Sequence, residues 1–155
     1  MTPEEMARRI AEAARVGGHT VAVAESLTSG KIAARLGAAP DAAQWFLGGV
    51  VAYDPGVKRS VLDVPDVPVV SRDCAEAMAQ GVRGLLGATV SVAVTGVGGP
   101  EDRDGESAGC VWLATASDDM VIAHRRDFEG DPEWVLAQTV EWALGYLLDA
   151  LDDPR

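Results

Sequence analysis

A carboxylate and a group of hydroxyls stand at the end of an apolar run near the start of the chain. In the segment VAVAESLTSG the apolar residues give way to Glu25 and Ser26, and Thr28, Ser29 and Gly30 then lead into a helical pattern. A serine at such a junction can act as a nucleophile towards a carbonyl group. The same residue types also cap ordinary helices, because a side-chain oxygen there accepts a free backbone N–H. The segment alone therefore leaves two interpretations open, a helix cap and a site for chemistry.

Two later apolar runs also end in polar residues. The second run ends near Tyr53, with Lys58 one helical turn later, and the third ends at Thr95 and Gly96. In open α/β sheets ligands bind beyond the carboxyl ends of parallel strands, so neighbouring strands would bring these residues to Ser26. Such a set suits acyl transfer, in which Ser26 attacks a carbonyl and an uncharged Lys58 accepts its proton. Burial would supply the lowered lysine pKa, because it disfavours the ammonium form.

Each of these residues also has an ordinary structural interpretation. Lysines such as Lys58 are mostly solvated, Tyr53 fits a half-buried strand aromatic, and Thr95 with Gly96 fits a turn. The glycine-rich loop at residues 96–109 contains no phosphate-binding lysine motif. Its acidic residues lack the spacing of a known calcium loop. We therefore expect no metal and no cofactor.

Composition limits the class of partner. The chain of 155 residues has 13 Lys and Arg against 24 Asp and Glu, a net charge of −11 and a pI near 4.5. This charge disfavours nucleic acid and anionic membranes as partners. Cys74 and Cys110 lack the spacing of a zinc site and suit a reducing cytoplasm, and no apolar run is long enough to span a membrane. The length predicts one domain over residues 1–151, followed by a disordered tail at 152–155.

Helical and strand patterns alternate along the chain. Helices are predicted at residues 3–16, from within 27–30 to 36, and at 56–64, 71–87 and 132–151. Strands are predicted at residues 19–26, 43–54 and 88–96, with a hairpin over 110–129 that turns at 117–119. This order predicts an α/β fold, a three-layer α/β/α sandwich with a mixed, mostly parallel sheet and a C-terminal hairpin.

Taken in order, the motifs resemble those of a known family. AES-L-T-S-G, WF-x-GGVVAY followed by a lysine, AVTG-x-x-GP, G-x-V-W and F-x-GD are similar to the CinA C-terminal-domain family, over about residues 5–148. Active members of that family are nicotinamide-nucleotide amidohydrolases. The resemblance implies hydrolysis of nicotinamide mononucleotide to nicotinate mononucleotide and ammonia without a metal. It places the family's serine, tyrosine and lysine on Ser26, Tyr53 and Lys58.

The chain departs from the family pattern around the expected substrate contacts. Ser29 stands where the family has a glycine, and the segment after Gly130 and Asp131 lacks two arginines that the family carries. An arginine fork suits phosphate and carboxylate groups, so the lost arginines are lost anion contacts. The departures therefore concern the substrate more than the fold.

These observations together predict a cytoplasmic amide hydrolase of the Ser/Lys type. Ser26 would be the nucleophile, Lys58 the base, and Tyr53 a proton relay or an orienting partner. Backbone amides around residues 28–30 would form the oxyanion site. The predicted substrate-binding residues are those at the strand ends and the following turn, namely Glu25, Thr28, Ser29, Gly30, Thr95 and Gly96.

The alternative is a non-catalytic binding or regulatory module with the same fold. This module would have lost the substrate-binding residues. The partner expected of the hydrolase is a small-molecule substrate, a pyridine nucleotide or a related amide. The apolar content and the tryptophans favour a homodimer but do not locate its interface.

Overall fold

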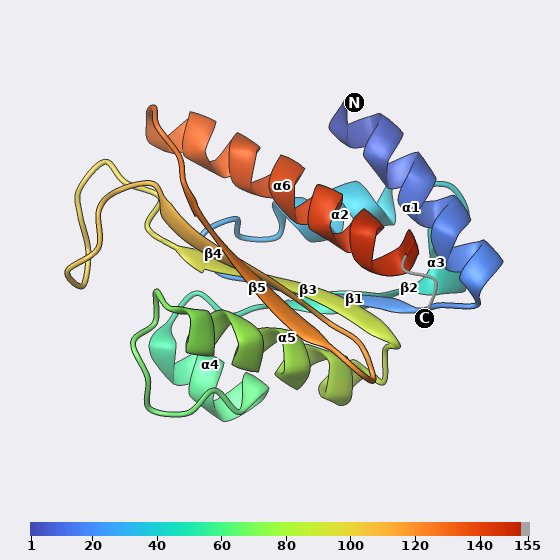
Figure 1. Ribbon diagram of the computed structural model, residues 1–155, viewed down its shortest axis with the longest axis horizontal. Helices are drawn as coiled ribbons and strands as arrows, with labels where there is room; N and C mark the ends of the chain where they lie inside the picture. Colours follow the sequence, from blue (N-terminus) through green and yellow to red (C-terminus); the bar gives the residue numbers. More distant parts are fainter. Residues whose placement is uncertain (153–155) are drawn as a thin grey trace.

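Five strands form one mixed sheet in the computed structural model, which describes residues 1–152 (Figure 1). The strands lie in the order β2 (Phe46–Val51), β1 (Val21–Glu25), β3 (Val90–Gly96), β4 (Cys110–Ala116) and β5 (Val121–Asp127). β1 pairs in parallel with β2 and β3, whereas β4 runs antiparallel to both β3 and β5. The carboxyl ends of β1, β2 and β3 therefore meet at one edge of the sheet.

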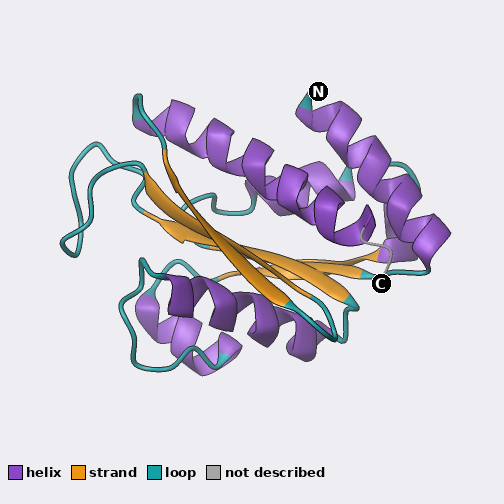
Figure 2. Ribbon diagram, viewed as in Figure 1, coloured by secondary structure: helices purple, strands orange, loops and turns teal. Residues whose placement is uncertain are grey.

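Helices cover both faces of this sheet (Figure 2). One face carries α1 (Pro3–Gly17), α2 (Lys31–Gly37), α3 (Ala42–Trp45) and α6 (Pro132–Asp152). The other face carries α5 (Arg72–Leu86), with α4 (Pro55–Leu62) packed beside it. The predicted α/β/α sandwich with its C-terminal hairpin is thereby confirmed.

β1 contacts both helical layers because successive side chains of a strand point to opposite faces. Val21 and Val23 belong to the hydrophobic core that α1 and α6 share, and Ala22 and Ala24 belong to the core on the side of α5. Every residue of β1 is buried. Burial on both faces explains why this strand is an unbroken apolar run up to Glu25.

The helix ends follow local capping signals. Thr2 and Glu5 form a reciprocal capping box at the start of α1, and Ser71 accepts the backbone N–H of Cys74 at the start of α5. The last helix extends to Asp152, the first residue of the predicted tail, whose other residues, 153–155, lie outside the described residues. No helix within residues 1–152 is both long and apolar enough to cross a membrane.

The strand predicted at residues 43–54 is wrong at its start. Ala42–Trp45 form the short helix α3, and β2 begins only at Phe46. The buried Trp45 indole N–H donates to the Pro40 carbonyl oxygen at 3.0 Å, so this helical turn satisfies its polar atom inside the core. β2 also ends before Tyr53, which therefore lies beyond the strand.

Candidate active site

A lysine and a serine meet at the carboxyl edge of the sheet. Lys58 Nζ donates hydrogen bonds to Ser26 Oγ and to the Tyr53 carbonyl oxygen, both at 3.0 Å. Ser26 is 6% exposed and Lys58 is 3% exposed. A basic nitrogen within hydrogen-bond distance of a serine hydroxyl is the arrangement that activates serine as a nucleophile.

Two strand ends and one helix start produce this contact. Ser26 directly follows β1, whose last residues pair in register with the end of β2. α4 then begins at once, because Asp54 accepts the Gly56 N–H at 2.8 Å and Pro55 occupies the first helical position. Lys58 lies one turn into α4 on its buried side. The Lys58 side chain therefore lies at the strand ends, where its Nζ reaches Ser26.

Burial sets the acidity of Lys58. Desolvation lowers the pKa of the amine below its ordinary value, and the nearby Arg103 charge lowers it further, whereas Cys74 and Asp54 act in the opposite direction. Desolvation is the largest of these effects and decides the direction. A lowered pKa leaves more of the amine uncharged near neutral pH. Only the uncharged amine can accept the serine proton.

Glu25 turns its carboxyl group into the start of α2 rather than into the cleft. Its oxygens accept the Thr28 hydroxyl at 2.6 Å and the backbone N–H groups of Ile32 and Ala33 at 3.0 and 2.9 Å. The residue is fully buried. α2 has no side-chain cap at its own N-terminal residue, Gly30, so Glu25 supplies the partners that a local cap would give.

The turn between β1 and α2 places Ser26. Ser29 and Gly30 have left-handed backbones, with φ of 50° and 98°, and the Ser29 N–H donates to the Ser26 carbonyl oxygen at 3.1 Å. Gly30 adopts this conformation at little cost because it has no Cβ. Glu25, Thr28, Ser29 and Gly30 are described residues outside the lining of the cleft. In the structure these four residues form the turn that positions Ser26, and their contact with substrate stays a prediction.

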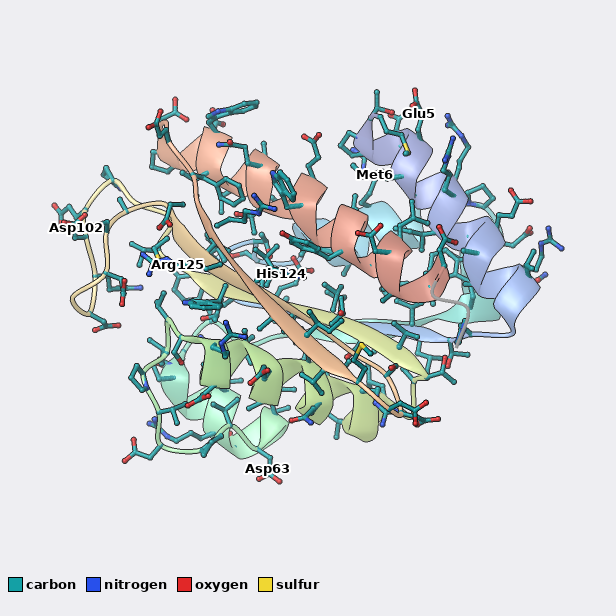
Figure 3. The ribbon with its side chains drawn as sticks, viewed as in Figure 1. Glu5, Met6, Asp63, Asp102, His124 and Arg125 are labelled. Carbon is teal, nitrogen blue, oxygen red and sulfur yellow. The ribbon has the colours of Figure 1, made fainter. Side chains whose placement is uncertain are left out.

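The cleft beside Ser26 has a volume of about 650 Å³. Its walls come from the strand ends, the start of α4, the loop between β3 and β4, and the start of α6. That loop projects beyond the sheet and carries Asp102 (Figures 1 and 3). The lining includes all three predicted catalytic residues together with Thr95 and Gly96.

Thr95 and Gly96 are held in the wall of the cleft by contacts with neighbouring backbone. The buried Thr95 hydroxyl donates to the Val69 carbonyl oxygen at 2.7 Å. A Cβ at Gly96 would lie 2.6 Å from the Cys110 carbonyl oxygen, so only glycine allows β3 and β4 to approach here. The Tyr53 phenol lies at the mouth of the cleft, since this side chain is 57% exposed.

The sequence analysis missed two residues of this site. Asp54 caps the helix that carries Lys58, and the Asp54–Pro55 pair is a sequence signal that would have revealed the cap. Arg103 also lines the cleft, but an arginine in a charged loop carries no such signal. Within residues 1–152, no three His, Cys, Asp or Glu side chains are grouped to hold a metal ion.

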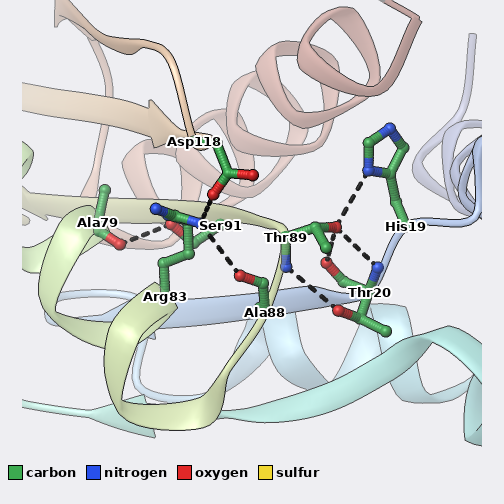
Figure 4. Close-up of polar contacts among 8 residues, drawn as sticks. All are labelled: His19, Thr20, Ala79, Arg83, Ala88, Thr89, Ser91 and Asp118. Carbon is green, nitrogen blue, oxygen red and sulfur yellow. Dashed lines mark hydrogen bonds and ion pairs between the residues drawn. The ribbon is translucent and has the colours of Figure 1, made fainter.

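A second cavity, of about 260 Å³, lies at the opposite end of the sheet. Polar residues of its lining make structural contacts: His19 Nδ1 lies 3.0 Å from Thr89 Oγ1, and Asp118 Oδ1 lies 2.9 Å from Nη1 of Arg83, a residue of α5 (Figure 4). The first contact joins the segments that precede β1 and β3, and the second joins α5 to the β4–β5 turn. The chemistry therefore points to the larger cleft.

Comparison with known proteins identifies relatives of this chain. Residues 3–151 match the CinA C-terminal domain. A nicotinamide-nucleotide amidohydrolase from Pseudomonas putida is 39% identical over 149 residues, 92% of this chain and 93% of that protein. A relative from Desulforamulus reducens is 43% identical over 82% of this chain, which spans only 32% of that longer protein. The crystal structure of the competence damage-inducible protein A from Klebsiella pneumoniae superposes with a TM-score of 0.95 at 35% identity, covering 100% of both chains.

Proposed function

Since the chain belongs to the CinA C-terminal domain family, we propose that it hydrolyses the amide of nicotinamide mononucleotide to give nicotinate mononucleotide and ammonia. The observation that carries this proposal is the buried hydrogen bond of 3.0 Å between Lys58 Nζ and Ser26 Oγ beside an open cleft. The name of the Pseudomonas putida relative supports the substrate class. A cleft of about 650 Å³ is also large enough for a mononucleotide.

Ser26 and Lys58 carry out the reaction in two halves. Uncharged Lys58 takes the proton of Ser26 as its oxygen attacks the amide carbon, and then gives that proton to the leaving nitrogen. Ammonia departs, and an ester remains on Ser26. Water then attacks the ester, Lys58 receives the proton of the water, and the return of a proton to Ser26 releases the carboxylate product.

The backbone and the side chain of Tyr53 have different roles in this proposal. Its carbonyl oxygen accepts a hydrogen bond from Lys58 Nζ and so orients the base towards Ser26. Its phenol makes no hydrogen bond within residues 1–152 and lies at the mouth of the cleft. The phenol is therefore available to the pyridine ring, and a role as proton relay would need the substrate to bring it to the site.

Two backbone amides of the cleft lining are candidate donors for the oxyanion. The Ser29 N–H is already bonded to the Ser26 carbonyl oxygen. Leu27 lines the cleft beside Ser26, and its N–H has no acceptor within residues 1–152. Gly98, across the cleft, likewise offers a backbone N–H. We propose these two amides as the donors, because a backbone N–H without another partner can stabilise developing negative charge.

The proposal is tested with the wild-type chain and three amides. Nicotinamide mononucleotide, nicotinamide riboside and nicotinamide are incubated with it in turn, and the products are separated by liquid chromatography. We expect nicotinate mononucleotide from the first at a rate of about 1 s⁻¹ or more, as for an ordinary enzyme. Folded protein that converts none of the three would contradict the proposal and favour a non-catalytic binding module.

A further inference from the structure

We propose that Arg103 binds the phosphate of the substrate and so selects a mononucleotide over its unphosphorylated riboside. This inference rests on the proposed function, because it names a contact within the same cleft. Arg103 lies in the loop between β3 and β4 and lines the cleft that contains Ser26 and Lys58.

The charges around the cleft leave one favourable place for an anion. Lys58 and Arg103 are the cationic side chains of the lining within residues 1–152. Lys58 is buried, already donates to two oxygens, and serves the reaction while uncharged. Arg103 is exposed, and its guanidinium has the fork geometry that suits a phosphate. A phosphate in this cleft therefore has the Arg103 guanidinium as its side-chain partner.

The carboxylates of the lining do not neutralise Arg103. Asp54 Oδ2 accepts the Gly56 N–H, and Asp102 Oδ1 accepts the Ala108 N–H at 2.9 Å, so both hold the backbone. Within residues 1–152 the Arg103 guanidinium forms neither an ion pair nor a hydrogen bond. The remaining carboxylates of the lining, Glu101 and Asp104, lie in the same loop, in which Arg103 is the one cationic side chain.

The loop backbone braces Arg103. Its N–H donates to the Glu106 carbonyl oxygen at 2.9 Å, and the Glu106 N–H donates back to the Arg103 carbonyl oxygen at 2.8 Å. Asp104 and Gly105 close this turn with φ of 53° and 79°. The Asp102 contact with Ala108 ties the two arms of the loop together. The base of the guanidinium stem is thus held in place before substrate arrives.

Arg103 also acts electrostatically on the reacting centre. Its charge lowers the pKa of Lys58, although desolvation, Cys74 and Asp54 each have a larger effect. The fork of an arginine pairs with two phosphate oxygens at once, so the contact fixes the orientation of the nucleotide as well as its position.

A binding experiment tests this without any turnover. Ribose 5-phosphate and ribose are titrated into the wild type, Arg103→Ala and Arg59→Ala by calorimetry. Arg59 is an exposed arginine of α4 outside the cleft lining, and its removal changes the net charge equally. We expect Arg103→Ala to weaken ribose 5-phosphate binding about tenfold or more, as for a lost hydrogen-bonded charge pair, and Arg59→Ala to leave it unchanged.

Three results would overturn the inference. Either the wild type binds ribose 5-phosphate no better than ribose, or Arg103→Ala binds it as well as the wild type does. An equal loss in Arg59→Ala would likewise overturn it, since net charge alone would then explain the effect. A chain that binds ribose 5-phosphate through Arg103 yet releases no ammonia would refute the proposed function and leave this inference standing.

Kinetics give a second, independent readout. In Arg103→Ala the KM for nicotinamide mononucleotide should rise about tenfold, while the KM for nicotinamide riboside should change less than about twofold. Loss of the Arg103 charge should also move the alkaline-rising limb of the rate to higher pH, because that charge lowers the pKa of Lys58. Equal changes for both substrates would contradict phosphate binding.

Discussion

Replacing Lys58 by Met is expected to lower kcat/KM for nicotinamide mononucleotide about 10³-fold or more, because the variant keeps the shape of the side chain but has no base for Ser26. The Lys58 amine is the group within hydrogen-bond distance of the Ser26 hydroxyl. Lys31, exposed at the start of α2, offers the same substitution outside the cleft. Lys31→Met should therefore keep nearly full activity, and an equally active Lys58→Met would refute the assignment of the base.

The pH dependence of the rate provides a second test of Lys58→Met. An amine whose pKa is lowered by desolvation is protonated below that pKa, so the wild-type rate should rise with pH and level off below the ordinary lysine value of 10.5. Between the folded and unfolded pKa the unfolded chain binds more protons at Lys58. Folding stability attributable to this residue therefore increases over that range of pH. Both the rising limb and this stability increment should vanish in Lys58→Met.

Replacing Glu25 by Ala is expected to lower the free energy of unfolding by about 3 kcal/mol or more. The change removes the acceptor of three hydrogen bonds and leaves the Ile32 and Ala33 N–H groups and the Thr28 hydroxyl without it. Each buried donor left without a partner costs about 1–3 kcal/mol. The free energy is measured by urea unfolding followed by circular dichroism.

Two further variants keep this prediction testable. Glu12, on the exposed side of α1, provides the matched control, and Glu12→Ala should change stability by less than about 0.5 kcal/mol. Glu25→Gln keeps one acceptor oxygen but points an NH₂ group at a backbone donor, so its loss should lie between those of the other two variants. A Glu25→Ala protein as stable as Glu12→Ala would show that this carboxyl group does not hold the start of α2.

The sequence predicts the reacting residues better than it predicts the residues that hold them in place. Ser26, Lys58 and Tyr53 follow strands whose carboxyl ends must meet once the sheet is parallel, so their proximity follows from the topology. The β1–α2 junction could be read from sequence either as a helix cap or as a reactive site, and in the structure different residues fill these two roles. Glu25 provides the cap, and Ser26, the next residue, faces Lys58. Local patterns could not assign these places, because the backbone partners of Glu25 lie seven and eight residues away.

Other features depend on contacts that no short pattern contains. The helical turn at Ala42–Trp45 depends on tertiary contacts of the Trp45 ring. The apolar run taken alone predicts a strand there. Arg103 becomes relevant only when its loop folds over the ends of the strands. The loop itself was predictable from its glycines and charges, but which of its side chains would line the cleft was not.

The role proposed for Ser26 is that of the nucleophile in amide hydrolysis. Its most direct test is ammonia release from nicotinamide mononucleotide, measured side by side for the wild type and a Ser26→Ala variant whose fold is verified by circular dichroism. Turnover by the wild type and a loss of about 10³-fold or more in the variant is the predicted result, because removing a nucleophile leaves only binding and oxyanion contacts. A folded Ser26→Ala protein that releases ammonia at the wild-type rate would contradict the claim.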